Sequence, residues 1–233
     1  MKDAVLYYCG LGYHNASING YSFDGVKLDP AHANYAKTCY YRVDHLLKSQ
    51  LKEGENELEI EVAPGWRKNG SEFFWSMLGK REIEFYGDSI LWAYLHIDYE
   101  DGTTEDIATD TTWECALDPR TSSIFNGETF DASLNKDFDD CDKLPVKAVP
   151  APGGEMRPMI LQPITNHTFY EPKEITNPKP GVVVVDFGQN IAGRMRVRLK
   201  GHAGRLYSFH FGEMLNPDGT LYNLNYRSAK STY

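Results

Sequence analysis

The sequence has no excess of basic residues and no long apolar run. Lysine and arginine together number 24 against 33 aspartate and glutamate residues, which gives a formal net charge of −9. Binding to a phosphate backbone needs a basic face, so nucleic acid is not an expected partner. No stretch approaches the roughly 18 apolar residues of a membrane-spanning helix, so a membrane is not an expected partner either.

The N-terminus lacks an export signal. The opening residues MKDAVLYYCG contain no apolar segment followed by a cleavage site. If this is the natural start of the protein, we expect a cytoplasmic location.

The four cysteines form no metal-binding or redox motif. Cys9, Cys39, Cys115 and Cys141 stand far apart without a CxxC pair, which excludes a zinc ribbon and a thioredoxin-like site. We expect four free thiols in a reducing compartment. A disulfide between Cys9 and Cys39 is the alternative.

Signatures of catalysis and of metal binding are also missing. The seven histidines show no HExxH spacing, and no serine stands in a GxSxG elbow. Glycosidic hydrolysis needs two carboxylates on opposite sides of one bond, and the many acidic residues form no recognisable pair. We therefore predict no catalytic residue, no metal ligand and no cofactor. The acidic segment 139–142 is either a solvated turn or a source of oxygen ligands for calcium.

Short strand patterns separated by turns run through the whole chain. Asn19-Gly20 tolerates the positive φ angles of a type I′ turn and predicts a hairpin between residues 11–18 and 21–26. Residues 58–62 alternate apolar and acidic side chains, which is typical of a half-buried strand. A second hairpin is expected around Asp101-Gly102, after the apolar run 90–99.

The remaining patterns also favour strands. Residues 182–185 form a β-branched run, and residues 194–199 alternate apolar side chains with arginines, so both predict strands. Helix is scarce, with one short helix expected in 41–56 from the helical spacing of Val43, Leu46 and Leu47. The fold class is therefore all-β, a sandwich or a barrel.

A change of composition suggests a domain boundary. Four prolines and two glycines crowd into residues 143–158. We predict one β-domain over residues 1–145 and a second over 146–233.

Aromatic residues offer a possible sugar site. Phe, Trp and Tyr make up 13% of the chain, and their flat faces stack on sugar rings. Trp66, Arg67 and Asn69 lie on a loop directly after a predicted strand, where a sandwich presents binding residues. Tyr13 and Asn15 flank another strand, so we predict that these five residues bind carbohydrate. Alternatively, Trp66 and the aromatic residues after it fill a core or dock onto a neighbouring domain.

The order of several motifs resembles a known family. Residues 184–233 are similar to the concanavalin-like domain of bacterial α-L-rhamnosidases, and the preceding motifs closely resemble the N-terminal domain of the same enzymes. These preceding motifs are Gly10-Leu11-Gly12-Tyr13, Asn19-Gly20, Leu28-Asp29-Pro30, Tyr41-Arg42, Gly54-Glu55-Asn56, Gly65-Trp66 and Asn126-Gly127-Glu128.

The resemblance implies a fold and a function. It implies a jelly-roll-like β-sandwich followed by part of a second, concanavalin-like sandwich. It also implies a parent enzyme that removes terminal α-L-rhamnose from plant glycosides or polysaccharides by inverting hydrolysis. In that family the catalytic carboxylates lie in an (α/α)₆ barrel further along the chain, which would begin after Tyr233. Some members bind rhamnose through calcium in an N-terminal sandwich, but no calcium ligand can be matched here.

We therefore expect a non-catalytic accessory region of an α-L-rhamnosidase. Its expected partners are rhamnose-containing glycans and the missing catalytic barrel. The alternative is a free-standing, lectin-like carbohydrate-binding protein.

Overall fold

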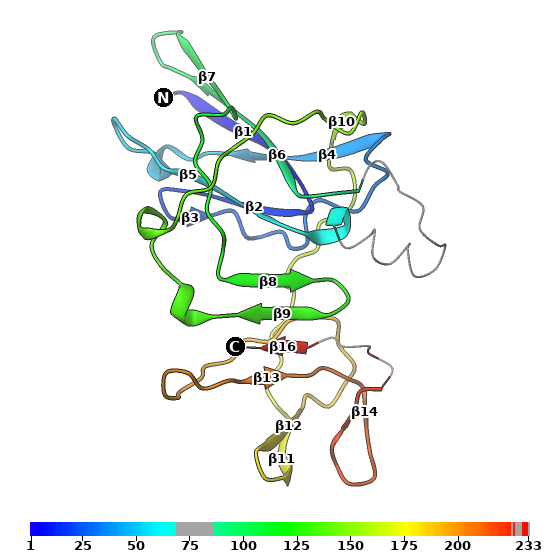
Figure 1. Ribbon diagram of the computed structural model, residues 1–233. Coiled ribbons are helices and arrows are strands. Elements are labelled where there is room, and N and C mark those ends of the chain that lie inside the picture. The colour runs from blue at the N-terminus through cyan, green and yellow to red at the C-terminus, as the bar shows by residue number, and fades with distance from the viewer. Residues whose placement is uncertain (69–85, 225, 227–229, 233) are drawn as a thin grey trace. The chain divides into compact units, whose positions relative to one another are not determined.

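The computed structural model covers residues 1–233 and describes all of them except 69–85, 225, 227–229 and 233. Strands dominate the described part, where helix is limited to short turns (Figure 1). This confirms the all-β prediction. The chain forms two compact units, one of residues 1–117 and 136–165, the other of residues 118–135 and 166–233. The domain boundary predicted between residues 145 and 146 stays a prediction.

The first unit is a sandwich of two sheets (Figure 1). One sheet has five strands in the order β10-β4-β1-β6-β7, and the other has three in the order β3-β2-β5. The strands of the larger sheet are β1 (Asp3–Leu11), β4 (Thr38–His45), β6 (Ile90–Asp98), β7 (Thr104–Ala108) and β10 (Glu155–Pro158). Those of the smaller sheet are β2 (Tyr13–Ile18), β3 (Tyr21–Ser22) and β5 (Leu58–Ala63).

The main hydrophobic core lies between these sheets. Leu6 and Tyr8 of β1 are fully buried and pack with Ile18 of β2 and Leu95 of β6. The expected alternation in β5 is confirmed, since its apolar residues are half-buried whereas the glutamates at 59 and 61 are exposed. Strand β1 pairs antiparallel with both β4 and β6, so it is the central strand of the larger sheet.

Both predicted hairpins are present, but the first is shorter than predicted, because Leu11 belongs to β1 and the second strand ends at Ser22. Asn19 and Gly20 have φ angles of 49° and 81°, and they join β2 to β3 with Ile18 opposite Tyr21. The amide of Asn19 also donates to the Gln50 carbonyl at 2.8 Å, which ties this turn to a distant loop. The second hairpin joins β6 to β7 through a turn that contains Gly102, whose φ is 85°.

The helix predicted in residues 41–56 is wrong in its first half. Val43 lies opposite Tyr7 in the ladder between β4 and β1, and strand β4 continues to His45. Backbone pairing with the central strand therefore overrides the helical spacing of Val43, Leu46 and Leu47. Only the 3₁₀ turn η1 (Lys48–Gln50) follows.

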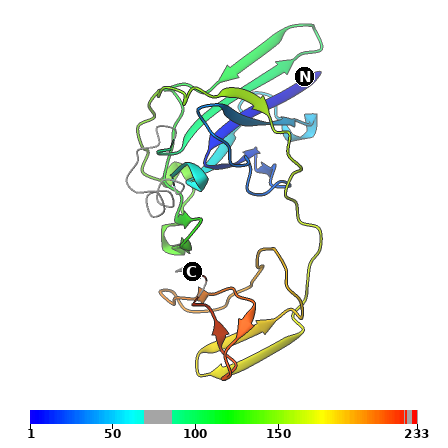
Figure 2. The same ribbon diagram turned by 90° about the vertical axis from the view of Figure 1, so that its right-hand side faces the viewer.

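The second unit has a four-stranded sheet in the order β13-β16-β9-β8 and two separate hairpins. The β-branched run predicted as a strand is confirmed as β12, which pairs with β11 (yellow in Figure 2). The strands are β8 (Arg120–Ser123), β9 (Gly127–Phe130), β11 (Glu174–Lys179), β12 (Val182–Asp186), β13 (Ser208–Phe209), β14 (Met214–Leu215), β15 (Leu221–Tyr222) and β16 (Lys230–Thr232).

The strand predicted over residues 194–199 is wrong. Residues 187–207 are all described and contain no strand. Alternating side chains define two faces, but a strand also needs a neighbour for its backbone hydrogen bonds. Segment 194–199 has no such neighbour among the described residues.

The second unit has little core of its own. Every described residue in it is exposed or half-buried, including Ile175 at 57%, Val183 at 61% and Met214 at 64% exposure. Hydrophobic stabilisation scales with the apolar area removed from water, so it is small here.

We expect this difference to appear in amide hydrogen exchange. Amides of the β11–β12 hairpin should exchange faster than those of β1 and β6, because a hairpin without a buried face opens at low free-energy cost. Hydrogen exchange followed by mass spectrometry measures both regions in one sample. Equal protection of the two regions would contradict this expectation.

Candidate functional site

Tyr13 and Asn15 lie on the outer face of the three-stranded sheet. The residues of β2 alternate, so that His14, Ala16 and Ile18 are buried whereas Tyr13, Asn15 and Ser17 are half-buried. Two residues of a strand span about 6.5 Å, so Tyr13 and Asn15 are neighbours on one surface.

A hollow of about 260 Å³ contains Asn15. Its remaining polar lining comes from β2, β3 and β5, and Glu61 lies directly opposite Asn15 in the ladder between β2 and β5. The complete lining is Asn15, Ala16, Ser17, Gly20, Ser22, Glu59 and Glu61.

The amide of Asn15 is only partly satisfied. Its nitrogen donates to the Ser22 hydroxyl at 3.3 Å, whereas its Oδ1 is buried and accepts no hydrogen bond from the described part of the chain. A buried acceptor without a donor costs roughly 1–3 kcal/mol. The acceptors that a ligand in the hollow can reach are instead the exposed hydroxyl of Ser22 and the exposed carboxylates of Glu59 and Glu61, which suit a ligand that donates hydrogen bonds, such as a sugar.

The structure brings Trp66 to Tyr13. Burial raises the pKa of the Tyr13 phenol, and a hydrogen bond from the Trp66 side chain acts in the opposite direction. The His32 ring lies on Trp66 with 5.1 Å between centroids, and it meets Tyr35 edge-on at 6.0 Å. Sequence reasoning missed His32 and Tyr35, since no motif links them to the other two residues.

Two glycines make this approach possible. Gly12 has a φ of 121° and Gly65 a φ of 49°. A Cβ on Gly12 would overlap the carbonyl oxygen of Ala63, and one on Gly65 would lie 2.6 Å from the carbonyl carbon of Gly12. The two backbones are therefore in direct contact, which places the helical turn 65–68 beside β2.

Arg67 has a packing role. Its Nε donates to the Asp88 carbonyl at 2.6 Å, and its own carbonyl accepts from the Gly87 amide at 3.1 Å. Burial lowers the pKa of Arg67, while the neighbouring Tyr35 acts in the opposite direction. Asn69, the fifth residue of the predicted sugar site, lies outside the described residues.

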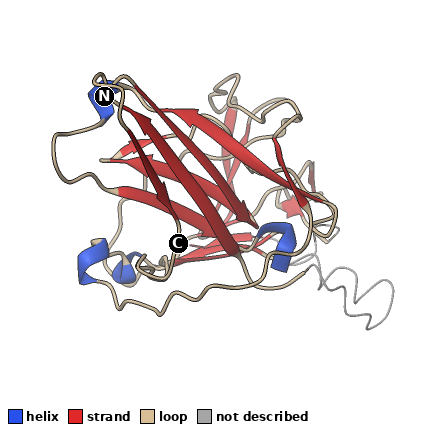
Figure 3. Cartoon of the chain, turned by 90° about the horizontal axis from the view of Figure 1, so that it is seen from above, coloured by secondary structure: helices blue, strands red, loops and turns tan. Residues whose placement is uncertain are grey.

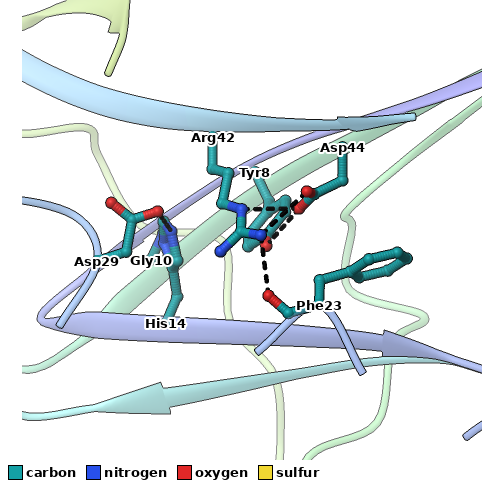
Figure 4. A network of polar contacts seen from close by, with 7 residues as sticks. All are labelled: Tyr8, Gly10, His14, Phe23, Asp29, Arg42 and Asp44. Atoms are coloured by element: carbon teal, nitrogen blue, oxygen red, sulfur yellow. Dashed lines mark hydrogen bonds and ion pairs between the residues drawn. The ribbon is translucent and has the colours of Figure 1, made fainter. Parts of the chain in front are cut away.

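A buried polar network lies on the inner side of the site (Figure 4). Nδ1 of His14 accepts from the Gly10 amide at 2.8 Å, so the proton of the neutral imidazole is on Nε2. That Nε2 lies 3.3 Å from Oδ2 of Asp29 and donates to it. The His14 side chain is fully buried, so this arrangement fixes both its tautomer and its orientation.

The other half of the network joins two strands, β1 and β4, and the loop that contains Phe23. Arg42 approaches Asp44 through Nε at 2.9 Å and Nη2 at 3.0 Å, and its Nη2 also donates to the Phe23 carbonyl at 2.8 Å. The Tyr8 hydroxyl donates to Asp44 at 2.8 Å. Burial, followed by the charge of Asp44, raises the pKa of Tyr8. These groups hold the sandwich together and do not face the hollow.

The acidic segment 139–142 has the geometry of a surface turn. Its first part is the exposed 3₁₀ turn η3 (Phe138–Asp140). Among the described residues there is no group of three or more His, Cys, Asp or Glu side chains that could hold a metal ion. Asp139, Asp140 and Asp142 are exposed, as expected for a solvated turn.

All four cysteines are free thiols, and the alternative of a disulfide between Cys9 and Cys39 is wrong. Burial raises the pKa of Cys9 to about 12, so this thiol remains protonated at neutral pH. No described helix has the length and apolar character needed to cross a bilayer.

We predict that Gly12→Ala strongly destabilises the first unit. Its Cβ would overlap a backbone oxygen, and its φ is strained for any other residue, so the free energy of unfolding should fall by about 2–4 kcal/mol. The control is Gly25→Ala, where a Cβ meets nothing within 4 Å. Chemical denaturation measures both variants. Equal stability of the two would show that the backbones at Gly12 and Gly65 are not in close contact.

Two family models match the chain. Residues 1–168 match the α-L-rhamnosidase N-terminal domain. Residues 176–233 match the bacterial α-L-rhamnosidase concanavalin-like domain. These matches confirm the resemblance inferred from the motifs, and with it the expected order of two β-domains.

Known proteins and solved structures agree with these models. An α-L-rhamnosidase of Streptomyces avermitilis is 34% identical over 243 residues, covering 100% of this chain and 23% of the relative. One from Formosa agariphila is 31% identical over 247 residues, covering 100% of this chain and 25% of the relative. The crystal structure of the S. avermitilis α-L-rhamnosidase complexed with L-rhamnose has a TM-score of 0.88 at 32% identity, covering 100% of this chain and 23% of that chain. The structure of the α-L-rhamnosidase from Dictyoglumus thermophilum has a TM-score of 0.85 at 27% identity, covering 100% of this chain and 26% of that chain.

The chain spans about a quarter of the length of these relatives. The match to the N-terminal domain covers 168 of its 233 residues. The chain therefore belongs to the family of α-L-rhamnosidase N-terminal domains.

Proposed function

We propose that this chain is a non-catalytic accessory region of an α-L-rhamnosidase. The whole protein would hydrolyse terminal α-L-rhamnose from plant glycosides or polysaccharides. This chain would support the catalytic domain and bind carbohydrate on the outer face of its three-stranded sheet. The observation that carries the proposal is that two consecutive family models match this chain, which covers only about a quarter of the length of its α-L-rhamnosidase relatives.

The chemistry of the acidic residues supports a non-catalytic role. A general acid of a glycosidase needs a raised pKa, so that it is protonated at neutral pH. In this chain, hydrogen bonds from Thr103 and Thr112 lower the pKa values of Asp101 and Asp110. The pKa of Asp218 is held well below its usual range by Lys179. The pKa values of these three carboxyls are therefore lowered, whereas a general acid needs a raised pKa.

The apolar surface of the second unit supports a docking role. Its hairpin strands expose Ile175, Val183 and Val185 by 40% or more. Exposed apolar patches of this kind commonly mark interaction surfaces. We propose that the remaining part of the enzyme, including its catalytic barrel, covers them.

The outer face of the three-stranded sheet has the chemistry of a sugar site. Tyr13 and Trp66 offer aromatic rings at one end, and the hollow around Asn15 offers oxygen acceptors beside them. A sugar combines C–H faces that stack on rings with hydroxyls that donate to such acceptors. One stacked ring face together with two or three hydrogen bonds, worth about 0.5–1.5 kcal/mol each, gives a dissociation constant of about 1 mM.

The proposal predicts that the purified chain does not hydrolyse an aryl α-L-rhamnoside. The release of the aryl group is measured against a full-length relative as the positive control. Turnover by the chain that disappears on substitution of a single Asp or Glu would contradict the non-catalytic role.

The proposal also predicts weak binding of L-rhamnose that depends on both ends of the site. NMR titration of L-rhamnose, with and without calcium, should give a dissociation constant of about 1 mM. Trp66→Ala and Asn15→Ala should each weaken binding about tenfold, whereas Asn190→Ala in the second unit serves as the control. If Trp66→Ala binds equally well, the loop at residue 66 is structural. If nothing binds under either condition, the sandwich is a scaffold only.

A further inference from the structure

Four aromatic rings form a continuous group on the outer face of the five-stranded sheet. Tyr7 of β1 lies opposite Tyr94 of β6, with 6.1 Å between ring centroids. Trp92 lies two residues before Tyr94 on the same strand, and these two rings are nearly parallel, at 11° and 6.5 Å. Tyr41 of β4 completes the group, 6.0 Å from Tyr7 and 6.4 Å from Trp92. We call these four residues the aromatic platform.

None of these rings belongs to the main core between the sheets, although Tyr41 also packs against a second, smaller buried cluster of Cys9, Leu11, Tyr35 and Cys39. Leu6 and Tyr8 point from β1 into the core, so Tyr7 points to the opposite face. Figure 3 shows the five-stranded sheet from this outer side. Trp92 is 42% exposed, and Val43 beside the platform is 37% exposed.

The platform is held in a fixed geometry. Tyr41 meets Trp92 at 63°, and it meets Tyr7 at 62°, so edge-on contacts set the ring orientations. Such edge-to-face pairs are stabilising arrangements of aromatic rings. A ligand that stacks here therefore meets rings that are already oriented.

Polar groups line one side of the platform. The Tyr94 hydroxyl donates to Oδ1 of Asp106 at 2.7 Å, and Nδ1 of His96 lies 2.6 Å from the same oxygen. Nε2 of His96 lies 3.7 Å from Asp98. These carboxylates have further acceptor capacity for hydroxyl donors, and they repel anionic ligands.

We propose that the aromatic platform binds an extended, neutral oligosaccharide. Its pyranose rings would stack on Trp92 and Tyr94, and its hydroxyls would donate to Asp106. This surface lies on the opposite sheet from the hollow around Asn15, so it is a second carbohydrate site that does not depend on the first.

The size of the surface argues against a protein partner. A large aromatic side chain has an accessible area of about 150–250 Å². Because Trp92 is 42% exposed and the three tyrosines are half-buried, the four rings present roughly 200–300 Å² in total, and Val43 adds little. A stable protein interface buries about 800 Å² on each partner. The platform is therefore too small for a protein and suits a few sugar rings.

Isothermal titration with neutral hexasaccharides tests this proposal. The probes are cellohexaose and xylohexaose, whose β-linked rings present flat C–H faces, and an oligogalacturonate of the same length is the anionic comparison. We expect at least one neutral probe to bind, and the anionic probe to bind at least tenfold more weakly.

Four variants locate the binding. Trp92→Ala should weaken it at least tenfold. Ile107→Ala is the matched control, because it is 39% exposed and lies opposite Leu95, which points to the other face of the same sheet. Trp66→Ala should leave hexasaccharide binding unchanged, which separates this proposal from the rhamnose site. Asp106→Asn keeps every ring and should weaken binding several-fold, so it tests the proposal even if Trp92→Ala fails to fold.

Three results would overturn the proposal. These are no binding of either neutral hexasaccharide, equal binding by the wild type and the folded Trp92 or Asp106 variant, and self-association of the wild type that Trp92→Ala abolishes. The last result, measured by sedimentation, would mean that a second copy of the chain covers the platform.

Discussion

The passage of the chain from one sheet to the other at Gly12 is the constraint on which the first unit depends. Strand β1 ends at Leu11 in the larger sheet, and β2 begins at Tyr13 in the smaller one, so a single residue makes the corner. The tight corner brings the backbone of Ala63 and Gly65 against Gly12. This corner at Gly12 determines three features of the first unit. They are the core between the sheets, the position of Trp66 and the outward direction of Asn15.

The buried polar network adds specificity to this arrangement more than it adds stability. Removing two charges from water costs several kcal/mol per ion, and a pair such as Arg42 and Asp44 recovers this only with good geometry and further hydrogen bonds. The network supplies those bonds through Tyr8 and the Phe23 carbonyl. Because Nη1 of Arg42 is buried and has no hydrogen-bond partner within the described part, the network does not fully offset the cost of removing these charges from water. What the network provides is a fixed conformation of the loop that contains Phe23, because Arg42 holds the carbonyl of that residue.

Local signals predicted the local structure well and the long-range structure poorly. Asn19-Gly20 specifies its hairpin through its own backbone angles, so the sequence alone was sufficient there. The helix predicted in the first half of residues 41–56 was wrong because pairing with β1 decided its conformation. The strand predicted over residues 194–199 was wrong because this segment has no pairing partner among the described residues. At the site, the position of Trp66 shortly after β5 could be predicted, but the helical turn 65–68 that carries it could not. The meeting of Trp66 with His32 could not, because it depends on a backbone contact between Gly12 and Gly65.

Two parallel pairings have a consequence for the order of events during synthesis. Strand β10 pairs with β4, and β16 pairs with β9, so each pair joins segments about a hundred residues apart in the chain. Closing such long loops costs conformational entropy, and this cost arises before the contacts between the paired strands can offset it. On a ribosome, the hairpin of β8 and β9 leaves the exit tunnel long before β16 exists. It therefore waits as an isolated two-stranded element with an open edge, and a nascent chain is most vulnerable to wrong strand pairing during this interval.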